Sequence, residues 1–124
     1  MTERARPDRP ISPEEIAVIR AALVRASTLP GAAGLADQLE QLRVIDRCEC
    51  GCDSVDFIPF DRDNRPKPIA DGTGETPAGG MVGLLIWGTA EAVTGIEVYD
   101  LGAGEGDIKL PVPDSIRPFK EGAA

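Results

Sequence analysis

Three cysteines fall within five residues, at Cys48, Cys50 and Cys52, in a 124-residue chain that contains no histidine. Thiolate sulfur is a strong zinc ligand, and a structural zinc ion takes four ligands in a tetrahedron. The three sulfurs would supply three ligands and the adjacent Asp53 the fourth. The candidate metal site is therefore Cys48, Cys50, Cys52 and Asp53, with Asp46, Glu49 or a second subunit as other sources of the fourth ligand.

Two other roles for the cysteines remain open. Cys48 and Cys50 could oxidise to each other, but a Cys-x-Cys ring is strained and the neighbouring acids disfavour the thiolate that redox chemistry needs. Small cysteine side chains also fit a tight, partly buried turn as hydrophobic residues. Without a histidine, the chain can form neither a Cys–His pair nor a Ser–His–Asp triad, so we assign no catalytic residue.

The cysteines are predicted to lie at the tip of a β-hairpin. Residues 43–48 and 54–60 are rich in the β-branched and apolar side chains that are typical of strands. Gly51 and Asp53, between them, have the composition of a tight turn. A turn at Gly51 would fold the three sulfurs toward one another, whereas an extended strand would only align them on one side.

Two helices are expected before this hairpin. Residues 1–11 predict a mobile arm. Ser12 and Glu15 have the spacing of a capping box, so a helix should begin after Ser12 and run to about residue 27, with an apolar face that faces the core. Leucines three and four residues apart predict a second helix over residues 34–42.

The second half of the chain predicts strands over residues 81–89, 92–101 and 108–110. Residues 61–80 contain three prolines and four glycines, which predict a flexible loop. Residues 114–124 are expected to form a frayed tail. The order of elements indicates the α+β class, with two N-terminal helices packed on an antiparallel sheet of about four strands, in a single domain over residues 12–113.

The segment 96–106 looks like the first motif of class I S-adenosylmethionine methyltransferases, in which a strand leads into a glycine loop. In that family the loop opens a helix inside a βαβ unit, and a further strand follows. Only eighteen residues follow Gly106, and three of them are prolines. Because this length cannot supply the rest of that sheet, we expect the glycines to provide positive φ angles in a hairpin loop.

The formal net charge of the chain is −8, and no segment forms a basic patch. Nucleic acid is therefore not an expected partner, because phosphate-backbone binding depends on clustered lysine and arginine. A protein with a basic surface is the expected partner, and a second copy of the chain is another. The apolar run from Met81 is too short to span a bilayer, and the N-terminus lacks a signal peptide, so we expect no membrane partner and a cytoplasmic location.

The run from Val44 to Phe57, with Cys-x-Cys-Gly-Cys followed by an apolar strand, resembles a group of small bacterial proteins of uncharacterised activity. In that group a later Glu-Val-Tyr strand leads to a Leu-Pro turn, and Glu97-Val98-Tyr99 and Leu110-Pro111 are similar to it. The resemblance covers about residues 12–113. It implies a bacterial cytosolic single domain and makes the cysteines a shared feature, but it implies no activity.

Three functions follow from the sequence. The first is a non-catalytic protein-binding or accessory domain, for which an immunity-like or antitoxin-like role is an analogy only. The second is a metal-binding module that uses the cysteine cluster for structural zinc, and no other cofactor is expected. The third is an S-adenosylmethionine-dependent methyltransferase, which the glycine motif favours and the chain length opposes.

Overall fold

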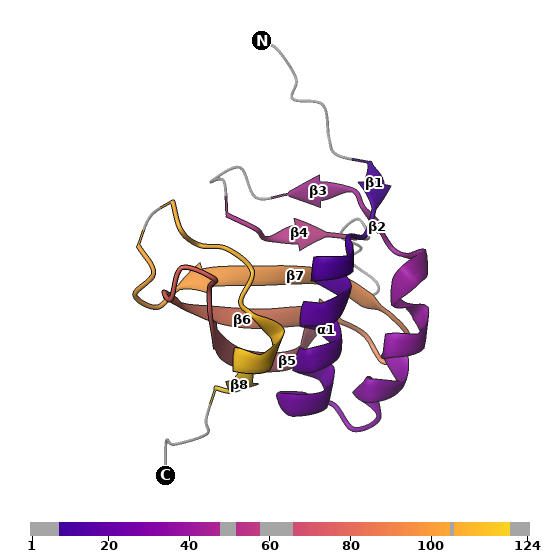
Figure 1. The fold of residues 1–124 in the computed structure, drawn as a ribbon. Helices are drawn as coiled ribbons and strands as arrows, with labels where there is room; N and C mark the ends of the chain where they lie inside the picture. Colours follow the sequence, from indigo (N-terminus) through magenta and orange to yellow (C-terminus); the bar gives the residue numbers. More distant parts are fainter. Residues whose placement is uncertain (1–7, 48–51, 58–65, 105, 120–124) are drawn as a thin grey trace.

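The computed structural model describes residues 8–47, 52–57, 66–104 and 106–119 (Figure 1). These residues form a six-stranded antiparallel sheet and two main helices, which confirms the α+β class. The prediction of about four strands is wrong, because short edge strands extend the sheet at both sides. In spatial order the strands are β3 (Asp46–Arg47), β4 (Val55–Asp56), β7 (Val93–Asp100), β6 (Met81–Gly88), β5 (Lys67–Glu75) and β8 (Arg117–Pro118).

The first helix, α1 (Pro13–Arg25), begins as the capping pattern predicts. The Glu15 backbone N–H donates to Ser12 Oγ at 3.1 Å, and the Ser12 backbone N–H donates to the Glu15 carboxylate at 2.8 Å. These two bonds satisfy N–H groups that the first turn of a helix leaves without intrahelical partners. The buried face of α1, which includes Ile19 and Leu23, packs against one side of the sheet.

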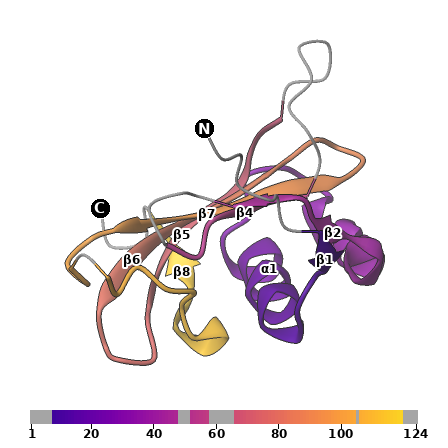
Figure 2. The same ribbon diagram turned by 90° about the horizontal axis from the view of Figure 1, so that it is seen from above.

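The second predicted helix forms as a 3₁₀ helix, η1 (Ala32–Gln41). It begins at Gly31, which has a φ of 80° and makes no side-chain capping bond. Leu35 and Leu39 are buried beside α1. Figure 2 shows α1 and η1 together on one side of the sheet. Neither these helices nor any other helix in the described ranges is long and apolar enough to cross a membrane.

The core lies between these helices and one face of the central strands. Along β6, the buried Val82, Leu84 and Ile86 alternate with Gly83 and with the partly exposed Leu85 and Trp87. Ile96 and Val98 continue the buried row on β7. Because side chains of a strand alternate between its two faces, the residues between them belong to the opposite face of the sheet.

The predicted flexible loop over residues 61–80 is corrected by the structure, which places strand β5 (Lys67–Glu75) within it. Strand β5 lies between β6 and β8, and its Ile69 is fully buried. Gly72 and Gly74 of this strand lie where another segment approaches the backbone closely, and they do not indicate a flexible chain. A Cβ on Gly72 would lie 2.5 Å from the carbonyl oxygen of Arg117 on β8, so only glycine lets these strands approach so closely.

The predicted mobile arm is also corrected over its last residues. Strand β1 (Arg9–Pro10) pairs with β2 (Arg43–Val44) in a separate two-stranded sheet, and Ile11 is buried. Arg9 reaches the carboxylate of Glu15 with two hydrogen bonds, of 2.9 and 3.0 Å. This part of the N-terminal segment is therefore tied to the start of α1, and residues 1–7 lie outside the described residues.

The predicted frayed tail is corrected as well. The chain forms a short 3₁₀ turn, η2 (Pro113–Ser115), then buries Ile116 and adds β8 to the edge of β5. The buried Ile116 packs at the end of the core and holds this segment against the sheet. The prolines on either side of it, Pro113 and Pro118, therefore lie in an ordered segment. Residues 120–124 lie outside the described residues.

Candidate functional site

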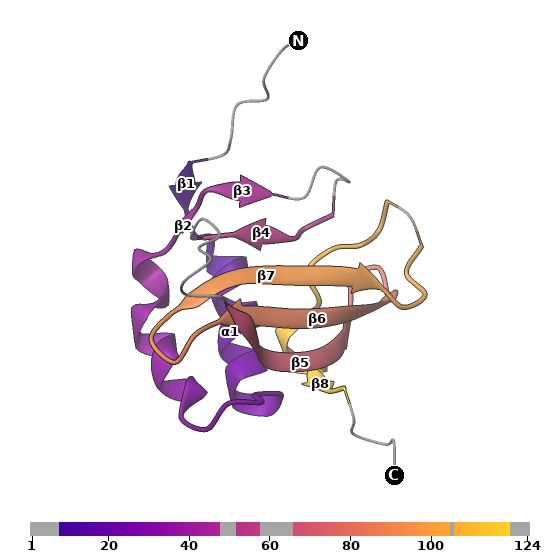
Figure 3. The same ribbon diagram turned by 180° about the vertical axis from the view of Figure 1, so that it is seen from behind.

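One face of the sheet is not covered by a helix in the described part of the chain. Figure 3 looks onto this face, with β5, β6 and β7 in front of α1. The partly exposed side chains that alternate with the core residues belong to it. We call it the open face, and its residues on the central strands are Asp71, Thr73, Gly83, Leu85, Trp87, Gly95, Glu97 and Tyr99, with Asp56 on β4.

Two glycines make room for larger groups on the open face. Gly83 pairs with Tyr99 across the β6–β7 ladder, and a Cβ at Gly83 would overlap the Tyr99 ring. Gly95 pairs with Asp56 on β4, and a Cβ there would lie 2.7 Å from Asp56 Oδ1. The Tyr99 ring and the Asp56 carboxylate therefore lie directly on the sheet, where a side chain at either glycine would displace them.

A pocket of about 670 Å³ opens along the edge of β7 beside these groups. Its lining combines the aromatic rings of Trp87 and Tyr99 with charged groups. Three carboxylates and one guanidinium give it a net charge of −2, from Asp56, Glu97, Asp100 and Arg47. Aromatic rings beside carboxylates favour a ligand that carries a positive charge and has a planar or apolar part.

Trp87 and Glu97 are joined across two strands of this site. The indole N–H of Trp87 donates to Glu97 Oε1 at 3.3 Å. This bond holds the carboxylate beside the indole ring and leaves Glu97 Oε2 without a hydrogen bond inside the described residues. The arrangement keeps an acceptor available for a ligand.

The acids of the open face repel one another. Partial burial raises the pKa of Asp56, and the nearby carboxylates of Asp46 and Glu97 raise it further. Partial burial also raises the pKa of Tyr99, with Asp71 and Glu97 adding to the effect. Like charges that are brought together in this way favour an added cation.

None of these acids forms an ion pair within the described residues. The four ion pairs found there join Arg9 to Glu15, Arg20 to Glu40, Arg25 to Asp114 and Arg43 to Asp8. Asp71 Oδ1 is buried and accepts no hydrogen bond from the described groups. A buried oxygen without a donor is costly, so a donor from outside this part of the chain would stabilise it.

The cysteine hairpin borders the same pocket. Strands β3 and β4 pair as predicted, with Arg47 opposite Val55, although residues 43–44, predicted as part of this hairpin, belong to β2. Cys52 lines the pocket, and its Sγ donates to Ser54 Oγ at 3.3 Å. Cys48 and Cys50 lie outside the described residues.

Asp53, the fourth predicted metal ligand, has a structural role in the described chain. Its Oδ2 accepts the Leu110 N–H at 2.8 Å, and its own N–H donates to the Ile108 carbonyl at 3.2 Å. These bonds replace the strand predicted over residues 108–110. The described residues contain no group of three metal-ligating side chains, and the zinc site at Cys48, Cys50, Cys52 and Asp53 stays a prediction.

The glycine motif forms a loop rather than the start of a helix. Asp100 Oδ1 accepts the N–H groups of Gly102 at 2.8 Å and Gly104 at 3.1 Å, and these bonds lower the pKa of Asp100. Gly102, Gly104 and Gly106 all have positive φ, as predicted. The strand before the loop, β7, has antiparallel neighbours on both sides, whereas the methyltransferase motif belongs to a parallel βαβ unit.

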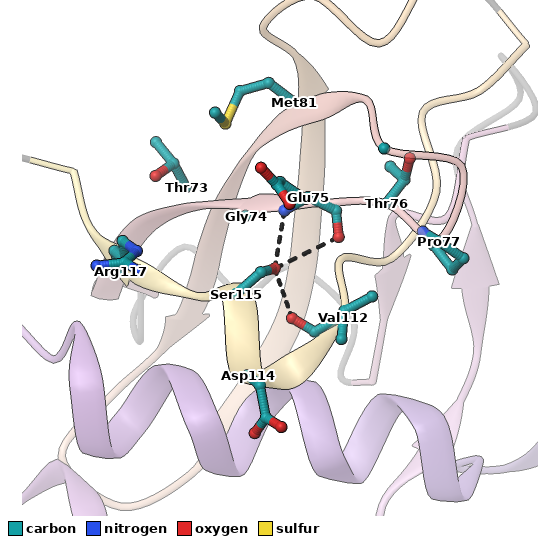
Figure 4. Close-up of a pocket in the computed structure, with 11 residues that line it drawn as sticks. Thr73, Gly74, Glu75, Thr76, Pro77, Met81, Val112, Asp114, Ser115 and Arg117 are labelled. Carbon is teal, nitrogen blue, oxygen red and sulfur yellow. Dashed lines mark hydrogen bonds between the residues drawn. The ribbon is translucent and has the colours of Figure 1, made fainter.

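A second pocket, of about 520 Å³, lies between the β5–β6 turn and η2 (Figure 4). Ser115 is its most reactive residue type, but the hydroxyl is used in structural bonds. Ser115 Oγ accepts the Glu75 N–H at 2.8 Å and donates to the Val112 carbonyl at 2.7 Å. The Ser115 hydroxyl therefore stabilises the local backbone of this pocket and is not available as a nucleophile.

Comparisons with family models, with curated proteins and with solved structures found no match for this chain. The function is therefore inferred from the open face itself. The sequence predictions did not identify Asp56, Trp87, Glu97 or Tyr99 as site residues. Their signal was the glycines at positions 83 and 95 inside apolar strands, together with the alternation of Glu97 and Tyr99 with core residues.

Proposed function

We propose that this chain is a non-catalytic protein-binding domain whose open face binds a basic surface of its partner. The observation that carries the proposal is the group of acids on this face, Asp46, Asp56, Asp71 and Glu97, none of which forms an ion pair within the described residues. A cation brought by a partner would relieve their mutual repulsion, so binding and local stability would be coupled.

The composition of the face supports this role. Aromatic residues are enriched in protein interfaces, and Trp87 and Tyr99 lie next to the acids. The net charge of −8 would also attract a basic partner over long range and speed association at low salt. An immunity-like or antitoxin-like role would fit a domain with this charge, by analogy only.

The reactive side chains that the structure describes support binding over catalysis. The hydroxyls of Ser54 and Ser115 are engaged by backbone groups. The chain has no histidine that could activate either hydroxyl as a general base. The cysteine cluster as a zinc module is a separate proposal, and zinc content that falls in a Cys50→Ser variant would support it.

The experiment compares two variants that each lose two negative charges. Asp56→Asn/Glu97→Gln removes acids of the open face, and Glu14→Gln/Asp37→Asn removes exposed acids of the helical layer. Binding of an alternating lysine–arginine octapeptide is measured by calorimetry at low and physiological salt. We expect the first variant to bind about tenfold more weakly and the second to match the parent protein.

An octaglutamate peptide is the charge control in the same titrations. We expect it not to bind. Equal losses in the two double variants would show that net charge alone attracts the basic peptide, and would reject the open face as the binding surface. No binding of the basic peptide at low salt would reject the proposed function itself.

A further inference from the structure

We propose that the open face selects arginine over lysine, by holding a guanidinium of the partner between the Tyr99 ring and the carboxylate of Glu97. This inference rests on the proposed function and specifies the partner's side chain. It follows from how each of these two groups is held on the sheet.

The Tyr99 ring is held flat against the sheet. The nearest atoms to a Cβ built at Gly83 are three ring carbons of Tyr99, so the ring covers the backbone of Gly83. One ring face therefore packs on β6 and the other faces away from the sheet. A guanidinium is planar and weakly hydrated, and it stacks on such a ring more readily than an ammonium does.

The carboxylate of Glu97, two residues from Tyr99 on the same face of β7, is held in place and has an unused acceptor. Glu97 is fixed through Oε1 by the Trp87 indole, which leaves Oε2 for a ligand. Asp56 lies over Gly95, four residues from Tyr99 along β7, so it adds negative charge to the face but does not reach the same guanidinium. A guanidinium offers five N–H donors in a fixed plane, so it can donate to Glu97 while it stacks on the Tyr99 ring.

The charge of the pocket suits such a ligand. Arg47 already lines the pocket, and with it included the net charge of the lining is still −2. Arg47 forms no ion pair with a described acid. One or two arginines of a partner would therefore neutralise the pocket, rather than reverse its charge.

The experiment uses the fluorescence of Trp87, the single tryptophan of the chain. The full chain is titrated with two acetylated and amidated pentapeptides, Gly-Arg-Gly-Arg-Gly and Gly-Lys-Gly-Lys-Gly, which have the same length and charge. We expect the arginine peptide to bind about fivefold more tightly and to change the Trp87 emission.

Two variants of Tyr99 separate stacking from charge. Tyr99→Phe keeps the ring, and the Tyr99 hydroxyl makes no hydrogen bond in the described residues, so we expect the preference for arginine to stay. Tyr99→Leu removes the ring, and we expect the two peptides to bind with equal affinity. Circular dichroism and thermal melting verify that both variants fold.

The outcomes distinguish this inference from the proposed function. Equal affinity of the parent protein for both peptides, with both weakened by Asp56→Asn/Glu97→Gln, would overturn arginine selection and leave the acidic binding face intact. A preference for arginine that persists in Tyr99→Leu would also overturn it. If neither peptide bound at low salt, both proposals would be wrong.

Discussion

The ring of Tyr99 lies on the backbone of Gly83, its direct partner across the β6–β7 ladder, in the space that a Cβ at position 83 would occupy. The contact covers the backbone of a strand glycine with an aromatic ring, as occurs in other sheets. It also sets the orientation of the ring, since one face packs on the strand and the other faces outward. A glycine inside an apolar strand thus shapes the candidate binding surface.

Replacing this glycine should therefore disturb both stability and the site. We expect Gly83→Ala to lower the free energy of unfolding by about 1–3 kcal/mol, because the Tyr99 ring must move to admit the new methyl group. Urea unfolding measures the loss, and near-UV circular dichroism reports the displaced ring. Gly34→Ala is the control, because a Cβ there meets no atom within 4 Å. If Gly83→Ala were as stable as the parent protein, the Tyr99 ring would not be packed on the backbone of Gly83.

Ser54 takes the place of a neighbouring strand at the edge of β7. The Val98 N–H donates to Ser54 Oγ at 2.8 Å, and the Ser54 hydroxyl is 3.2 Å from the Val98 carbonyl oxygen. We expect Ser54→Ala to destabilise the protein by about 1–2 kcal/mol, because both backbone groups lose their partner. Amide exchange at Val98 should speed up, and Ser54→Thr should restore part of the protection. Unchanged exchange in Ser54→Ala would be inconsistent with this role.

The capping box predicts a pH-dependent stability. Burial alone would raise the pKa of Glu15, but hydrogen bonds from Arg9 and Ser12 outweigh it, so the pKa in the folded protein is lowered. Stability from the ionised Glu15 is therefore full above its unfolded pKa and is lost as pH falls through the folded value. We expect Glu15→Gln to cost about 1 kcal/mol at neutral pH and much less near pH 3, by thermal melting. A deficit in Glu15→Gln that stays constant from neutral pH to pH 3 would contradict the role of the ionised carboxylate.

Asp56 should behave in the opposite sense. Its pKa in the folded protein is raised by burial and by the carboxylates of Asp46 and Glu97, so its ionised form destabilises the fold. The penalty is full above the folded pKa and disappears as pH falls below the unfolded value. We expect Asp56→Asn to stabilise the protein at neutral pH by up to about 1 kcal/mol, with no gain at low pH.

The same substitution should weaken binding of the basic octapeptide, because it removes a negative charge from the open face. A residue that is kept for binding can in this way lower the stability of the fold. Melting curves at several pH values and calorimetric titration of the one variant test both effects. Lower stability of the variant at neutral pH would show that Asp56 stabilises the fold. Binding as tight as that of the parent protein would show that Asp56 is not part of the binding surface.

Local chemistry made part of the fold predictable. The Ser12–Glu15 capping box and the apolar runs of β6 and β7 depend on residues close in sequence, and the structure confirms each of them. Strand β5 was missed because its glycines and prolines resemble a loop, whereas Gly72 is required by the approach of β8. That requirement comes from Arg117, which lies 45 residues away along the chain, so no local pattern could reveal it.

The candidate site was less predictable than the fold. The alternation along β7 separates Glu97 and Tyr99 from Ile96 and Val98, but it does not show which face the helices cover. Asp56 reaches the site through the pairing of β4 with β7, a contact between distant segments. The cysteines drew attention through their spacing, and the one that is described, Cys52, borders the same pocket.

The most direct test of the acidic binding face is a nitrogen–proton NMR titration of the full chain with the basic octapeptide. We expect the indole N–H signal of Trp87 and the amide signals of Glu97 and Tyr99 to shift most, because they lie at the pocket. The signals of amides on the solvent-exposed side of α1 should not shift. Shifts centred on α1 or η1, with the Trp87 indole unchanged, would contradict the open face as the binding surface.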